Sequence, residues 1–129
     1  MSQGDYKNYR LGHLKEKVVK FDVVLLQEMF ELGGRQGSLI HYARAHGLPY
    51  HAGPVRPKIA SKQLIDSGLL ILSRYPIVQR DFLRFTRKMG ADGLCSKGAL
   101  YAKLQVAPDA YLHVFTTHTQ SGESREYDP

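Results

Sequence analysis

The stretch Phe21-Asp22-Val23-Val24-Leu25-Leu26 decides how the chain folds. A short, ungapped run of β-branched and aliphatic residues is typical of a strand that is buried on both faces. The run ends at Gln27-Glu28, so we predict a buried strand over residues 21–26 with a carboxylate at its carboxyl end. Residues 68–73 form a similar run and predict a second buried strand, which stops at Tyr75-Pro76 because proline lacks the N–H that a sheet needs.

Apolar spacing outside these strands predicts two helices. Apolar residues recur at helical intervals within residues 6–20, which favours a helix there. Residues 38–46 indicate a second helix, with Ser38 as its N-cap and Gly47 as its C-cap. Residues 47–66 are rich in proline and glycine, and we interpret them as a surface loop.

The second half of the chain has strand composition in two places. Residues 99–106 and 112–118 flank a turn at Pro108-Asp109 and predict a hairpin. The pattern weakens between Arg80 and this hairpin, and residues 120–129 are polar with no closing helix or strand. The four predicted strands amount to about one sheet of a two-sheet architecture, which would leave an apolar face uncovered.

Composition limits the class of protein. The 129 residues have room for one domain and not for two, and a hydrophobic content of 43% is enough for a core. The single cysteine, Cys95, excludes an intramolecular disulfide framework and a multi-cysteine zinc site. The formal charge of +6 favours phosphate-bearing partners, although a solvated basic surface would also account for it.

Glu28 and His118 are candidate functional residues because each ends a predicted strand. The carboxylate of Glu28 suits Mg²⁺, which takes one or two protein carboxylates and completes its shell with water and phosphate. The imidazole of His118 can donate a proton to a developing oxyanion or bind a phosphoryl oxygen. Both residues also suit ordinary roles, Glu28 as a solvated strand end and His118 as a hydrogen-bonded structural histidine.

Residues 90–98 form a glycine-rich loop that contains Asp92 and Lys97. Exposed backbone amides together with Lys97 would suit an anion, and Asp92 could pair with Lys97 to hold the loop in one state. The loop lacks the spacing of a Walker motif, and a surface turn with a weak ion pair is the alternative. No base is placed to activate Cys95, so we do not expect it to act as a nucleophile.

The order of four segments resembles the neutral sphingomyelinase branch of the endonuclease/exonuclease/phosphatase superfamily. Residues 21–30 are similar to its strand with a Gln-Glu ending, and residues 66–77 to its second block. The third and fourth blocks correspond to Ser96-Lys97-Gly98-Ala99-Leu100 and Thr117-His118-Thr119-Gln120. The resemblance covers about residues 10 to 122.

The resemblance implies a role for each matched residue. Glu28 would bind the catalytic magnesium, and His118 would contact the scissile phosphate near the leaving oxygen. Asp92 and Lys97 would form a switchable pair beside the site. The implied fold is α+β, a four-layer α/β/β/α sandwich, and the implied reaction is Mg²⁺-dependent hydrolysis of the phospholipid sphingomyelin to ceramide and phosphocholine.

Three family motifs have no counterpart in the sequence: a first strand that ends in asparagine, an Asp-x-Asn motif and a late Ser-Asp-His motif. Thr119 also stands where a leucine is usual. We therefore expect residues 1–129 to be the N-terminal to middle portion of such a catalytic domain, inactive or nearly so alone. The alternatives are another superfamily enzyme, a nuclease or an inositol-phosphate phosphatase, and a non-catalytic module that binds lipid or a protein partner.

Substrate class and location follow from the same features. The block Ser73-Arg74-Tyr75-Pro76, followed by Ser96-Lys97-Gly98, favours the lipid branch over nucleic acid. The sequence contains no apolar run of about 18 residues that could span a membrane, and its start lacks the pattern of a signal peptide. We expect a protein of the membrane surface or the cytoplasm, and the basic loop from Arg56 to Lys62 could touch anionic lipid.

Overall fold

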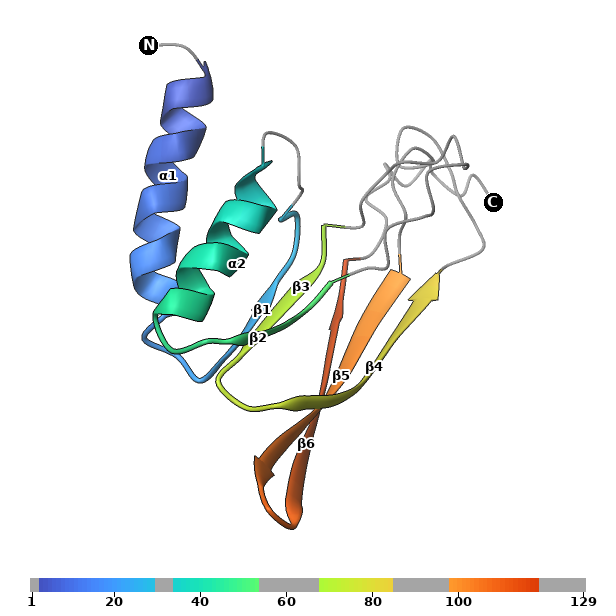
Figure 1. The fold of residues 1–129 in the computed structure, drawn as a ribbon. Coiled ribbons are helices and arrows are strands. Elements are labelled where there is room, and N and C mark those ends of the chain that lie inside the picture. Colours follow the sequence, from blue (N-terminus) through green and yellow to red (C-terminus); the bar gives the residue numbers. More distant parts are fainter. Residues whose placement is uncertain (1–2, 30–33, 54–67, 85–97, 119–129) are drawn as a thin grey trace, which may run out of the picture.

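The computed structural model describes residues 3–29, 34–53, 68–84 and 98–118. The described chain is α+β, as the sequence predicts, with two helices and two three-stranded antiparallel sheets (Figure 1). We call the sheet with strand order β1-β3-β2 sheet A and the sheet with strand order β4-β5-β6 sheet B. The elements are α1 (Gln3–Val18), β1 (Val23–Leu26), α2 (Arg35–Ala45), β2 (Tyr50–Ala52), β3 (Leu70–Ser73), β4 (Ile77–Arg84), β5 (Gly98–Ala107) and β6 (Ala110–Thr117).

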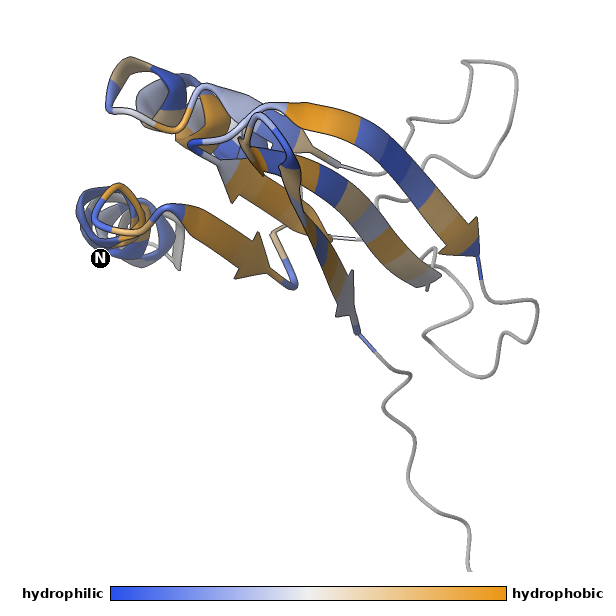
Figure 2. Cartoon of the chain, turned by 90° about the horizontal axis from the view of Figure 1, so that it is seen from below, coloured by the Kyte–Doolittle hydropathy of each residue, from blue (hydrophilic) through white to orange (hydrophobic). Residues whose placement is uncertain are grey.

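Sheet A lies between the two helices and sheet B. Side chains alternate between the faces of a strand, so Leu70 and Leu72 of β3 point to one side and Ile71 to the other. The helix-side core contains Val18, Leu39, Ala43, Leu48, Leu70 and Leu72. The core between the sheets contains Ala52, Leu69, Ile71, Leu100, Ala102 and Leu104. Some strands are hydrophobic along their length, whereas others, and the helix beside the N-terminus, mix hydrophobic with hydrophilic residues (Figure 2).

The two strands predicted to be buried on both faces differ in the structure. Every residue of β3 is buried, which confirms the prediction for that strand. The same prediction is wrong for β1, where Leu25, on the side that faces sheet B, is 40% exposed. The reason is position in the sheet: β3 is the middle strand of sheet A, while β1 lies at one edge of the described part.

The predicted strands do not form one sheet. β1 and β3 belong to sheet A, whereas β5 and β6 form the predicted hairpin within sheet B. The other two strands were not predicted: β2 falls in the expected loop, and the second half of β4 falls in the weak region of the pattern. β2 has three residues, too few to show a period, and most side chains of β4 are exposed, so apolar alternation is missing.

Both predicted helices are present, with different caps. α2 begins at Arg35 after Gly34, so Ser38 is not its N-cap. The hydroxyl of Ser38 instead accepts a 2.7 Å hydrogen bond from Nζ of Lys15, which ties α2 to α1. Gly47 follows the C-cap residue His46 and has a φ of 95°, a conformation that glycine adopts without strain.

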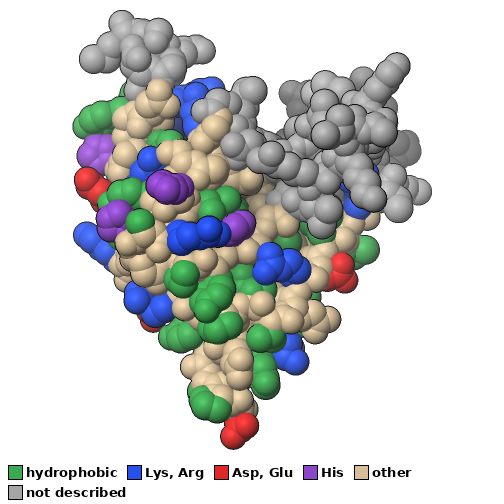
Figure 3. Space-filling model, viewed as in Figure 1, with side chains coloured by type: hydrophobic (Ala, Val, Ile, Leu, Met, Phe, Trp, Pro, Cys, Tyr) green, Lys and Arg blue, Asp and Glu red, His purple; other side chains and the backbone are tan. Residues whose placement is uncertain are grey.

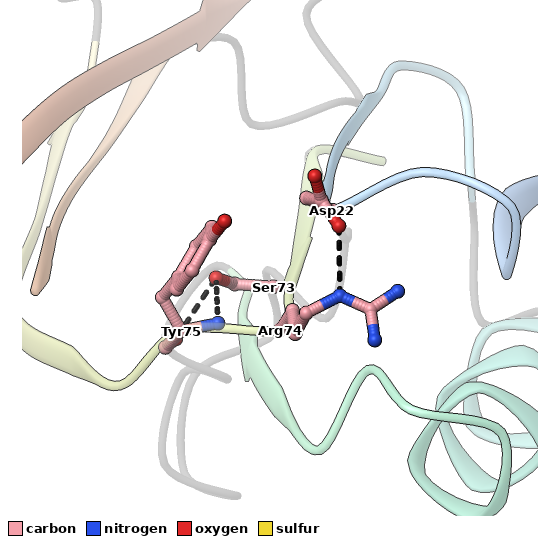
Figure 4. Close-up of polar contacts among 4 residues, drawn as sticks. All are labelled: Asp22, Ser73, Arg74 and Tyr75. Atoms are coloured by element: carbon pink, nitrogen blue, oxygen red, sulfur yellow. Dashed lines mark hydrogen bonds and ion pairs between the residues drawn. The ribbon is translucent and has the colours of Figure 1, made fainter. Parts of the chain in front are cut away.

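The Ser73-Arg74-Tyr75 segment shapes the corner between β3 and β4 (Figure 4). Oγ of Ser73 accepts a hydrogen bond from the backbone N–H of Tyr75 (2.9 Å) and donates one to its carbonyl oxygen (2.8 Å). Arg74 pairs through Nε with Oδ1 of Asp22 at 2.7 Å. Because Asp22 precedes β1 and Glu28 follows it, this motif lies at the opposite end of sheet A from Glu28 and supports the fold there.

Candidate functional site

The structure brings Glu28 and His118 together, although 90 positions separate them in the sequence. Glu28 lies beyond the end of β1 in sheet A, and His118 lies beyond the end of β6 in sheet B. Nε2 of His118 is 3.4 Å from Oε1 of Glu28, and their side chains are 29% and 67% exposed. A carboxylate and an imidazole therefore share an accessible position where the two sheets meet.

Hydrogen bonds on both sides of Glu28 fix the end of β1. Nε2 of Gln27 donates a 2.7 Å bond to Oγ1 of Thr116, which is buried in β6. The N–H of Met29 donates to the carbonyl oxygen of Gly68 (2.7 Å), and Nε2 of Gln36 donates to the carbonyl oxygen of Met29 (2.8 Å). The residues before and after Glu28 are thus attached to three different elements or their ends.

The backbone of Glu28 is itself unusual, with a φ of 58°. This left-handed conformation costs a residue with a Cβ atom about 1–2 kcal/mol, and such strain persists only where neighbouring contacts enforce it. The bonds of Gln27 and Met29 supply that enforcement. The sequence did not identify Gln27 and Thr116 as positioning residues. The only feature that could have indicated this role is that each is a polar residue at the end of an apolar run.

A groove of about 670 Å³ adjoins Glu28. Glu28, Met29 and Arg35 line it from one side, and residues of α1 line the rest: Lys7, Arg10, Leu11, His13, Leu14 and Lys17. Four of the lining side chains are lysine or arginine, which hydrogen-bond and attract phosphate groups. Lysine and arginine on an amphipathic helix ordinarily face water, so the sequence pattern alone does not single out this basic lining.

Glu28 is the residue of this position that could contact a metal ion. No group of three or more His, Cys, Asp or Glu residues gathers within the described ranges. An exposed carboxylate such as that of Glu28 fits Mg²⁺ as one of the few protein ligands this ion takes. Asp92, Lys97 and Cys95 lie outside the described residues.

Comparison with known proteins identifies relatives of this chain. No family model matches the chain. A sphingomyelinase of Dictyostelium discoideum is 34% identical over 98% of this chain, which spans 29% of that protein. The crystal structure of sphingomyelinase C from Streptomyces griseocarneus superposes with a TM-score of 0.69 and 31% identity, covering 96% of this chain and 47% of its own. The chain is a homologue of the sphingomyelinase C and beta-toxin proteins.

The beta toxins show the same relationship. A variant beta toxin of Staphylococcus aureus, crystallised with bound magnesium ions, superposes with a TM-score of 0.67 and 26% identity over 97% of this chain and 48% of that one. The resemblance found in the sequence is therefore confirmed. This sphingomyelinase C homologue spans about half the length of the solved structures that it matches. Neither described helix is long and apolar enough to cross a membrane.

Proposed function

We propose that this chain is the N-terminal to middle portion of a Mg²⁺-dependent phosphodiesterase domain that hydrolyses sphingomyelin to ceramide and phosphocholine. The observation that carries the proposal is the 3.4 Å approach of Glu28 and His118 in a homologue of sphingomyelinases. The whole domain would be a four-layer α/β/β/α sandwich. Residues 1–129 would contribute one helical layer and part of each sheet.

In this proposal Glu28 holds Mg²⁺ through its carboxylate. The bound ion supplies positive charge to the phosphoryl group and lowers the pKa of water at the site. His118 donates a hydrogen bond from Nε2 to the phosphate, close to the oxygen that leaves with ceramide. The Gln27–Thr116 bond keeps the two residues at a fixed separation, since a misplacement of about 1 Å can cost a factor of 100 in rate.

The basic groove has a role before the chemical step. Its lysine and arginine side chains lie beside Glu28 and attract the negatively charged phosphodiester toward that carboxylate. Asp92 and Lys97 would act as a switchable ion pair next to the substrate. Because the described residues supply a single carboxylate at the site, we propose that the 129-residue chain has little activity alone.

The test uses the longest natural form of the protein that contains these residues. It is assayed with Mg²⁺ on sphingomyelin vesicles, plasmid DNA and an inositol phosphate. We expect release of phosphocholine, with losses of about 100-fold or more in kcat/KM for Glu28→Gln and His118→Asn. His41→Asn, at an exposed position of α2, is the matched control and should retain full activity.

The other outcomes overturn the proposal in different ways. Cleavage of DNA or inositol phosphate without cleavage of sphingomyelin would assign the chain to another branch of the superfamily. Absence of hydrolysis with all three substrates would favour a non-catalytic module. Equal losses in His41→Asn and His118→Asn would remove His118 from the site.

A further inference from the structure

A second basic surface lies away from Glu28, at the edge of sheet A that β2 forms. It consists of Arg44 of α2, His51 of β2 and Arg80 of β4, and we call it the β2-edge patch. Nη1 of Arg80 donates a 3.1 Å hydrogen bond to the carbonyl oxygen of His51, which joins sheet B to sheet A at this point. On this face of the molecule, Lys, Arg and His side chains gather across the middle, while acidic side chains lie toward the rim (Figure 3).

The two arginine charges of the patch meet no carboxylate among the residues that the structure describes. Within the described part of the chain, neither Arg44 nor Arg80 forms an ion pair with a carboxylate. Nearby, Arg74 differs, because Asp22 pairs with it at 2.7 Å. Asp81 follows Arg80 directly, but alternation along β4 places it on the opposite face of sheet B, where its Oδ1 accepts a bond from the N–H of Phe82.

Arg44 and Arg80 both influence the imidazole of His51, and Arg80 also contacts its backbone. Partial burial lowers the pKa of its imidazole, and the charges of Arg44 and Arg80 lower it further. Two arginine charges from different elements therefore lie beside His51, and no carboxylate pairs with either of them within the described residues. An anion placed there would gain attraction from both arginines.

The patch is separate from the candidate active site. β2 is two strands from β1 in sheet A, about 10 Å across the sheet at ordinary strand spacing, whereas Glu28 extends beyond the end of β1. His51 pairs with Leu72 in the middle of sheet A, not at the end where Glu28 and His118 meet. A ligand on the patch would thus leave the Glu28 groove open.

We propose that the β2-edge patch binds the phosphate groups of anionic lipids and holds the domain on the membrane surface. The proposal rests on the proposed function, because an enzyme whose substrate is a lipid works at a bilayer. Arg44 and Arg80 are exposed side chains on different elements, an arrangement that presents charge to a surface. Each arginine near an anionic bilayer strengthens partitioning about fivefold.

The experiment measures cosedimentation of the 129-residue chain with vesicles in EDTA and low salt, without any hydrolysis. We expect binding to vesicles that contain phosphatidylglycerol and much weaker binding to pure phosphatidylcholine. Arg44→Gln/Arg80→Gln should lower the partition coefficient about 30-fold. Lys20→Gln/Arg84→Gln is the matched control: it removes the same charge from exposed positions outside the patch and should cost less than about threefold.

Three results would overturn the proposal. The first is no preference of the chain for anionic vesicles, and the second is an equal loss in both double variants when circular dichroism shows that both are folded. The third is displacement by millimolar inorganic phosphate at constant ionic strength, which would assign the patch to free phosphate. Because EDTA excludes hydrolysis, vesicle binding can fail or succeed independently of the activity assay for Glu28 and His118.

Discussion

Nε2 of Gln27 donates a 2.7 Å hydrogen bond to Oγ1 of Thr116 and so links the end of β1 to the end of β6. Gln27 directly precedes Glu28, and Thr116 lies two positions before His118. This hydrogen bond between side chains of different sheets therefore connects the elements that carry the carboxylate and the imidazole. Burial of Thr116 makes it harder for water to replace the bond.

The bond between Gln27 and Thr116 predicts coupling between the two residues. Thr116→Val keeps the shape of the side chain and removes the acceptor, while Gln27→Leu removes the donor. In a double-mutant cycle of urea unfolding, we expect the two changes to be non-additive by about 1 kcal/mol, because each single variant already breaks the bond. Changes that add to within about 0.3 kcal/mol would show that the bond contributes nothing to stability.

The left-handed backbone at Glu28 predicts a difference between two variants that both lack the carboxylate. Glycine adopts a φ of 58° freely, whereas alanine keeps the Cβ that makes this conformation costly. We expect Glu28→Gly to be more stable than Glu28→Ala by about 1 kcal/mol in free energy of unfolding. Equal stabilities, measured by urea titration, would mean that residue 28 leaves this conformation once the carboxylate is removed.

The hydrophobic pattern of the sequence predicts those parts of the site that depend only on residues adjacent in the sequence. The apolar run before Glu28 and the strand before His118 are both visible in the sequence, and both end where the structure ends them to within a few residues. The 3.4 Å approach of the two side chains is not visible there, because it depends on how sheet A packs on sheet B. The resemblance to a family suggested that both residues share a site, which periodicity alone did not.

The two strands that the sequence did not predict, β2 and β4, escaped prediction for the same physical reason. β4 exposes most of its side chains and β2 has three residues, so neither produces a hydrophobic period. The basic lining of the Glu28 groove was missed for a different reason: the sequence pattern of lysine and arginine on a helix is the same whether these side chains face water or a groove. Features that depend on contacts between distant parts of the chain can be recognised only from the tertiary structure.

Close packing at Gly98 predicts that replacing this glycine destabilises the chain. A Cβ atom there would lie 2.6 Å from Cζ of Phe82 and would clash with the carbonyl oxygen of Leu83, a backbone atom of the paired strand β4. We expect Gly98→Ala to lower the free energy of unfolding by about 1–3 kcal/mol. Gly12→Ala is the contrasting variant, because a Cβ there meets nothing within 4 Å in α1, and we expect it to stabilise the chain by about 0.5–1 kcal/mol. Thermal or urea unfolding measures both, and a tolerated Gly98→Ala would contradict the packing of β4 on β5.

The lowered pKa of His51 predicts how stability varies with pH. Burial and the charges of Arg44 and Arg80 favour the neutral imidazole in the folded chain, while the unfolded chain keeps the ordinary value near 6.5. Between the two pKa values the unfolded state therefore binds more protons, so the contribution of His51 is full above pH 6.5 and declines as the pH falls toward the folded value. We expect His51→Gln to flatten this part of the curve of unfolding free energy against pH, which urea titrations at several pH values measure.

The two causes of the His51 shift can be separated by experiment. In Arg44→Gln/Arg80→Gln, the pKa of His51 should rise because two repelling charges are gone, yet it should stay below 6.5 because burial remains the larger cause. Titration of the imidazole by NMR measures this directly. An unchanged pKa would show that the two arginines do not face His51, and the β2-edge patch would then lose the convergence of charge that makes it a site for anionic lipid.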